Sequence, residues 1–103
     1  MKRIGFTMQL NPGQAEEYQR RHDEIWPELK TLLSENGIGE YTIWLDPVTG
    51  ILFAQQTVAD DYDDTKLAEH PVMKKWWAYM DDLMDTHADS SPVCKLLQEM
   101  FHM

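Results

Sequence analysis

The chain is poor in cysteine, and this absence already limits its chemistry. Cys94 is the one cysteine among 103 residues, which excludes a disulfide within the chain and suits a reducing cytoplasm. A single thiol with no histidine near it in the sequence is a weak candidate for a nucleophile. We therefore expect Cys94 to act as a small buried apolar side chain.

Basic residues are also scarce. The chain has 9 Lys and Arg against 18 Asp and Glu, which gives a formal net charge of -9. A surplus of this sign repels phosphate backbones, and no basic stripe offsets it, so the composition argues against nucleic-acid binding. The same charge favours a neutral substrate over a phosphorylated one.

Motifs for export, membrane insertion and cofactor binding are missing as well. The first residues carry no signal-peptide pattern, and no apolar run approaches the ~20 residues of a membrane span, so we expect a cytoplasmic protein. The five glycines are scattered, and no Gly-x-Ser-x-Gly elbow occurs. The four histidines show neither His-x-His nor His-Glu-x-x-His spacing. We therefore expect no metal and no cofactor.

What is present is the apolar pattern of one folded domain, residues 1–103. Apolar and polar residues alternate over 4–10, which predicts a strand. Helical spacing then runs from Asn11-Pro12-Gly13 to Asn36-Gly37, and Pro27 must kink or split this helix. The rest of the pattern predicts a strand at 38–45, a turn at 46–50, a strand at 51–58, a short helix to His70, a helix from Pro71 to about Met84, a loop at 85–93 and a last strand at 94–102.

The predicted order is β-α-β-β-α-β, which defines an α+β fold of the ferredoxin-like type. Four antiparallel strands then carry helices on one face, and the other face has no helical cover. An exposed apolar face of that extent is a liability in a monomer. We therefore expect two sheets to pack face to face in a homodimer, which would also enclose volume between them.

Tyr18 and His22 form the first candidate site. Residues four apart on a helix share one face, so these two side chains can project into a single cavity. Histidine has an unperturbed pKa of about 6.5, which suits proton transfer near neutral pH. A proline five residues further on places His22 near the end of the first half of the helix.

Aromatic residues supply the second candidate set. Trp76 and Trp77 are adjacent on a helix and point about 100 degrees apart, so one can face the core while the other faces a cavity or a partner subunit. Both can equally be packing residues, and on spacing alone Tyr18 and Tyr41 have the same two interpretations. The functional interpretation is that indole surfaces stack on the C–H faces of a sugar ring while polar groups reach its hydroxyls.

Several blocks along the chain together resemble the L-rhamnose mutarotase family. They are Phe6-Thr-Met-Gln9, Glu17-Tyr-Gln-Arg-Arg-His22, Ile25-Trp-Pro-Glu-Leu29, Leu45-Asp46, Leu52-Phe-Ala54, Trp76-Trp77-x-x-Met80 and Ser91-Pro92. The resemblance runs nearly end to end, and the order and spacing of the blocks are more specific than any one of them.

The resemblance implies a cofactor-free sugar 1-epimerase that interconverts the α and β anomers of L-rhamnose. It also implies a dimeric α/β barrel of ferredoxin-like subunits. In that family the histidine of the Tyr-x-x-x-His segment is the proton donor, here His22. The sugar contacts implied are Tyr18, Tyr41, Trp76 and Trp77, and all five positions carry the expected residue types.

Two stretches depart from the family pattern. Residues 60–70 lack the expected tryptophan, and Thr86 to Ser90 replace an expected Asn-Pro-Asp. These departures concern loop geometry and the preference among related deoxy-sugars.

Two other classes of function remain open from the sequence. One is a cofactor-independent monooxygenase of the same dimeric barrel type, whose pocket would also be lined by His and Trp. The other is a non-catalytic dimeric ligand-binding module. The remaining histidines, at 70, 87 and 102, are expected to have structural or surface roles.

Overall fold

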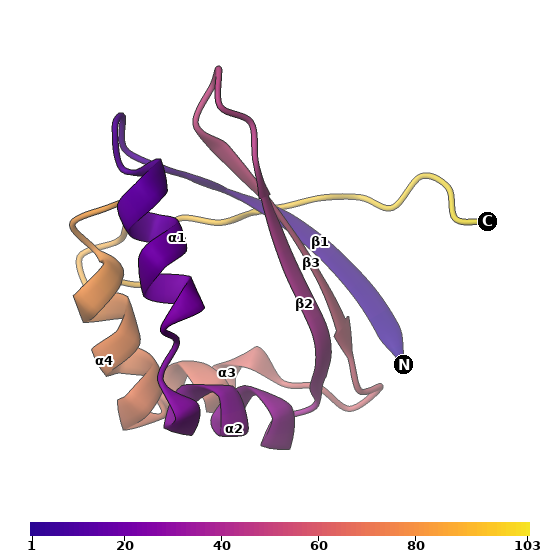
Figure 1. Cartoon of the computed structure of the whole chain (residues 1–103). Helices are drawn as coiled ribbons and strands as arrows, with labels where there is room; N and C mark the ends of the chain where they lie inside the picture. The colour runs from indigo at the N-terminus through magenta and orange to yellow at the C-terminus, as the bar shows by residue number, and fades with distance from the viewer.

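The computed structural model describes residues 1–103, folded as a four-stranded antiparallel sheet with helices on one side (Figure 1). The strand order is β2-β3-β1-β4. The elements are β1 (Lys2–Gln9), α1 (Ala15–Asp23), α2 (Pro27–Glu35), β2 (Ile38–Leu45), β3 (Ile51–Val58), α3 (Asp64–Glu69), α4 (Pro71–Met80) and β4 (Lys95–Leu96). The predicted α+β class and the predicted β-α-β-β-α-β order are confirmed.

Alternation along the strands decides which face of the sheet is buried. In β3 the even-numbered residues Leu52, Ala54 and Val58 are at most 3% exposed, and they face the helices. In β1, Met8 pairs with Leu52 and lies on the same face. Because the side-chain period of a strand is two, the odd-numbered positions point to the face without helices.

Pro27 splits the long predicted helix into α1 and α2. It is the first residue of α2, and Trp26 before it is extended, with φ -61° and ψ 129°. The proline ring disfavours helical geometry in the residue before it and suits the first turn of a helix. The segment from Glu24 to Trp26 is therefore irregular, as predicted, and His22 lies in the last turn of α1.

The predicted bounds of β1, 4–10, are off by one or two residues, since the strand runs from Lys2 to Gln9. Three other predicted boundaries are wrong by more. The first helix starts at Ala15 rather than at Pro12, because Gly13 turns the chain first with a φ of +78°. The helix predicted to reach Met84 ends at Met80, since Met84 instead forms a bridge to Leu10 at the end of β1.

The third wrong boundary is the last strand, which has two residues rather than the predicted 94–102. Beyond Leu97, whose N–H donates to the carbonyl of Gly5, no backbone hydrogen bond joins the tail to β1. Figure 1 shows this tail running past the sheet and away from the helices. The backbone of the tail after Leu97 is therefore not paired with a strand.

The helix-free face carries large apolar side chains. Trp44 on β2 is 53% exposed and lies directly opposite Phe53 on β3, which is 40% exposed. None of the four helices combines the length and the apolar character that crossing a bilayer requires.

Candidate active site

A cavity of about 1470 Å³ lies between the helices and the helix-facing side of the sheet. Its walls are mostly hydrophobic, with a few polar groups among them, which is the usual composition of a small-molecule site. All five predicted site residues line it: Tyr18, His22, Tyr41, Trp76 and Trp77. The cavity lies on the other side of the sheet from the helix-free face, where two sheets were expected to enclose volume.

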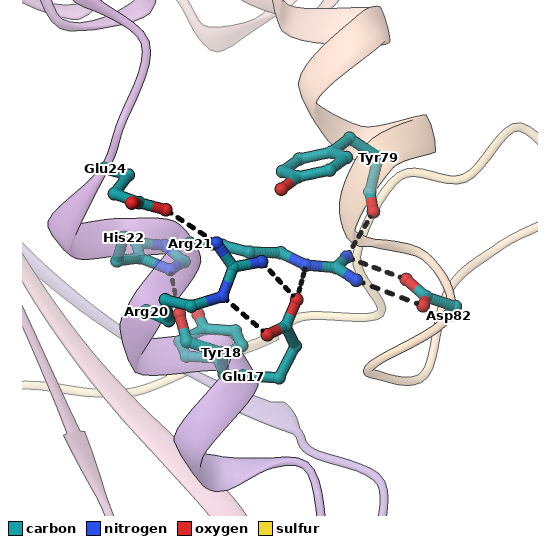
Figure 2. Close-up of polar contacts among 8 residues, drawn as sticks. All are labelled: Glu17, Tyr18, Arg20, Arg21, His22, Glu24, Tyr79 and Asp82. Atoms are coloured by element: carbon teal, nitrogen blue, oxygen red, sulfur yellow. Dashed lines mark hydrogen bonds and ion pairs between the residues drawn. The ribbon is translucent and has the colours of Figure 1, made fainter.

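Tyr18 and His22 project together, as the helical spacing predicted. Their rings stack with centroids 4.4 Å apart and an interplanar angle of 25°. His22 Nδ1 lies 3.0 Å from the backbone carbonyl oxygen of Tyr18 (Figure 2). A carbonyl oxygen can only accept, so Nδ1 carries the proton and donates. In the neutral ring, Nε2 is then the nitrogen with the free lone pair.

Burial adjusts the acidity of both groups. Desolvation lowers the pKa of His22 below 6.5, against smaller opposing effects of the Tyr18 carbonyl and of Asp23. Desolvation also raises the pKa of the Tyr18 hydroxyl above its ordinary value of 10.0. At neutral pH the imidazole is therefore mainly neutral, and the phenol is protonated and able to donate a hydrogen bond.

The two tryptophans have different environments. Trp76 is 6% exposed and meets the His22 ring edge-to-face, with centroids 5.4 Å apart and planes at 87°. It also contacts Trp26 and Tyr79, at 5.1 and 5.7 Å between centroids. Trp77 is partly buried and packs against the core beside the cavity. Trp76 therefore supports the histidine as well as lining the cavity.

Tyr41 approaches the cavity from the sheet. The residue as a whole is 40% exposed because β2 is an edge strand. Its ring packs edge-on against Phe6, and desolvation of its hydroxyl raises the pKa above 10.0. Its hydroxyl therefore stays protonated near neutral pH.

Gln56 is a cavity residue that the sequence analysis missed. It is 6% exposed, the one buried polar residue of the chain, and it lies opposite Tyr41 in the β2–β3 pairing. A signal for it exists in the sequence, since it is the single polar residue among the four inward positions of β3. Its amide adds both donors and an acceptor to the sheet side of a mostly hydrophobic cavity.

Two other expectations can be compared with the structure. Cys94 was expected to be buried and is exposed, because it lies just before the short β4 at the sheet edge. No group of three or more His, Cys, Asp or Glu side chains is arranged to hold a metal ion.

Comparison with known proteins identifies the family. A sequence model of the L-rhamnose mutarotase family matches residues 3–103. The chain belongs to this family. A curated L-rhamnose mutarotase from Sinorhizobium fredii is 52% identical over 103 residues, covering 100% of this chain and 99% of that protein. One from Brucella anthropi is 53% identical over 102 residues, covering 99% of this chain and 96% of that protein.

A solved structure supports the same assignment. The crystal structure of an L-rhamnose mutarotase from Formosa agariphila is 47% identical, with a TM-score of 0.93. The superposition covers 100% of this chain and 99% of that one. The family resemblance seen in the sequence is confirmed over the whole length of the mutarotase-like chain.

Proposed function

We propose that this protein interconverts the α and β anomers of L-rhamnose. The observation that carries the proposal is one cavity in which His22, the histidine of the Tyr-x-x-x-His segment, contacts Tyr18 and Trp76. Full-length likeness to proteins named L-rhamnose mutarotase supports the substrate. The acidic chain and the largely apolar cavity favour a neutral sugar.

Anomer exchange breaks and re-forms the bond between C1 and the ring oxygen, and proton transfers make both steps possible. The anomeric hydroxyl loses a proton while the ring oxygen gains one, and the ring opens to the aldehyde. Rotation about the C1–C2 bond and reclosure give the other anomer. Positioned acid–base groups typically accelerate such transfers by about 10²–10⁴-fold, and no redox step is involved.

His22 is the proposed proton donor to the ring oxygen. Its Nδ1 is occupied by the Tyr18 carbonyl, so Nε2 is the nitrogen that exchanges a proton with the sugar. The donor is the minor protonated form of the ring, which carries a proton on Nε2 as well, and the lowered pKa makes this form a stronger acid than free imidazolium. The proton given to the ring oxygen on opening is recovered by Nε2 on closure.

The other predicted residues are proposed to bind the sugar. Tyr18 and Tyr41 keep their hydroxyl protons at neutral pH and can donate to sugar oxygens. Trp76 and Trp77 present indole surfaces to the C–H faces of the ring. The partner that acts on the anomeric hydroxyl is Tyr18, a water or a carboxylate.

A homodimer is the proposed assembly. The helix-free face exposes Trp44 and Phe53 side by side across β2 and β3. Face-to-face packing of two such sheets removes this apolar area from water, which is the arrangement of a dimeric α/β barrel.

Saturation-transfer NMR between the anomeric protons of L-rhamnose tests the activity directly. We expect the protein to accelerate exchange, and His22→Ala to abolish the acceleration while sugar binding is retained. His87→Ala is the matched control, because His87 is exposed in the loop before β4 and lies outside the cavity. Full activity in His22→Ala would remove His22 from the mechanism, and binding without any acceleration would indicate a non-catalytic module.

A further inference from the structure

Arg21 makes the one ion pair that joins α1 to another part of the fold. Its Nη1 donates to Asp82 Oδ1 at 2.9 Å and to the backbone carbonyl of Tyr79 at 2.6 Å. Its Nη2 donates to Asp82 Oδ2 at 3.3 Å. The guanidinium carbon lies 4.5 Å from the centre of the Tyr79 ring, and the side chain is only 11% exposed (Figure 2). Arg21 therefore binds both the last turn of α4, at Tyr79, and the segment that follows it, at Asp82.

The same side chain is also fixed from α1. Arg21 Nε donates to Glu17 Oε2 at 2.8 Å, one helical turn back. Contacts with Arg20 and Arg21 hold the pKa of the Glu17 carboxyl at about 2, so this partner is ionised throughout the working pH range. A forked guanidinium held by two carboxylates and a carbonyl has little freedom to change rotamer.

Arg21 is also linked to His22 through the aromatic rings of Tyr79 and Trp76. Tyr79 packs against Trp76 at 5.7 Å between ring centroids, and Trp76 meets the His22 ring at 5.4 Å. Arg21 directly precedes His22 in α1. The four residues thus form a closed ring of contacts that spans α1 and α4.

Few other contacts fix the rotation of α1. The helix has nine residues, its N-terminus has no side-chain cap, and Tyr18 is its one buried residue. Helices this short are not stable by themselves and take their orientation from packing. A single additional anchor in the last turn can therefore decide where the histidine ring points.

We propose that Arg21 is a positioning residue for the proton transfer, because it ties the last turn of α1 to the end of α4 and so holds His22 against Trp76. This inference rests on the proposed function and adds a residue outside its catalytic and sugar-binding set. Arg21 itself is not among the residues that line the cavity.

The first test is Arg21→Gln, which retains part of the side-chain stem and removes the charge and the fork. Misplacement of a catalytic group by about 1 Å can cost about 100-fold, so we expect kcat for anomer exchange to fall roughly 10- to 100-fold. KM should change less, since the sugar contacts from β2 and α4 remain. Rates are measured by saturation-transfer NMR at a temperature where circular dichroism shows each variant fully folded. Arg21→Lys restores one ion pair without the fork and should recover part of the loss.

Arg20→Gln is the matched control. Arg20 is adjacent, also pairs with Glu17, and has its other ion pair with Glu24. It has no ion pair with Asp82, and it interacts with α4 through the Tyr79 side chain alone. We expect wild-type kcat in this variant. An equal loss in Arg20→Gln would overturn the proposal, because the effect would then come from helix charge rather than from the α1–α4 contact.

A second readout does not depend on activity. Loosening the contact hydrates the His22 ring, so its pKa, followed by NMR titration, should rise toward 6.5 in Arg21→Gln and stay lowered in Arg20→Gln. The Tyr18 backbone carbonyl and the Asp23 carboxylate, which both act on this ring, are unchanged in both variants. If the wild-type protein fails to exchange anomers, the proposed function fails, while the titration still decides the positioning role.

Asp82→Asn removes the partner charge and leaves Arg21 and its contact with Tyr79 in place. It serves as the test if Arg21→Gln does not fold, with the same expected drop in kcat and rise in the His22 pKa. Wild-type kcat and an unchanged His22 pKa in whichever variant folds would overturn the proposal.

Discussion

At the scale of single residues, His22 links the acidity of the site to the stability of the fold. Desolvation keeps the pKa of the folded His22 below 6.5, which is the ordinary value for an unfolded chain. Between those two values the unfolded chain binds a proton that the folded chain does not, so stability rises with pH across this window. The contribution is complete above about pH 6.5 and is lost as pH falls through the folded pKa.

We therefore expect the free energy of unfolding to fall as pH is lowered from 7 to 5, and to fall less steeply in His22→Gln. Urea denaturation at several pH values measures both slopes. The range stops at pH 5 because the Glu17 carboxyl, with a pKa of about 2 against 4.5 unfolded, adds its own loss of stability below that point. Identical slopes in the two proteins would show that burial of His22 has no thermodynamic cost.

The shared direction of Tyr18 and His22 was predictable from local spacing, but the contacts that support the candidate site were not. Tyr18 and His22 follow from a four-residue helical repeat, whereas Tyr41 was implied by the family resemblance, because its place in a strand left a packing role open. The Arg21–Asp82 ion pair joins residues 61 apart in sequence, and no local pattern specifies such a pairing. Only the packing of α1 on α4 brings the two together.

At the scale of secondary-structure elements, the predicted bounds that agree with the structure are those set by strong local sequence patterns. The strands at 38–45 and 51–58 were predicted at the observed bounds because alternation and turn residues coincide there. The end of α4 was missed because Leu83 and Met84 continue the apolar spacing of the helix, yet both are buried by a turn toward β1. Tertiary packing overrides periodicity at such junctions.

The break between α1 and α2 at Pro27 is expected to affect both stability and catalysis. In Pro27→Ala the residue before it is no longer held extended, so α1 and α2 can merge and draw Trp26 away from Trp76, which it contacts at 5.1 Å. We expect the free energy of unfolding to fall by about 0.4–1 kcal/mol from the added freedom of the unfolded chain. We also expect kcat to fall because His22 loses its fixed helix end. Urea denaturation and anomer-exchange NMR measure the two effects.

Thr31→Ala is the control for the proline substitution. Thr31 is exposed in α2 and lies outside the cavity, so its replacement by a better helix former should leave kcat unchanged. A wild-type kcat in Pro27→Ala would show that the break between the two helices is not needed for catalysis.

At the scale of the whole molecule, the two faces of the sheet have different roles. The helix-facing side holds the cavity and the core, while the other side exposes Trp44 and Phe53. The sequence predicted this division from strand alternation, but it could not place the site, because both faces carry aromatic residues. All five predicted site residues line one cavity of this single chain.

Because the proposed dimer interface and the candidate site lie on different faces of the sheet, one variant can test assembly apart from activity. A lysine at Phe53, which is exposed on the helix-free face and does not line the cavity, would place an unpaired ammonium in a sheet-to-sheet interface, which is strongly unfavourable. We expect Phe53→Lys to sediment as a single chain where the wild-type protein sediments as a dimer. Because every residue assigned to the sugar and to the proton lies on the opposite face, the single chain should keep most of its anomer-exchange rate. Val48→Lys, at a 91% exposed position in the β2–β3 turn, should remain dimeric. A wild-type protein that sediments as a single chain would refute the proposed dimer, and a folded but inactive single-chain variant would mean that the partner subunit completes the site.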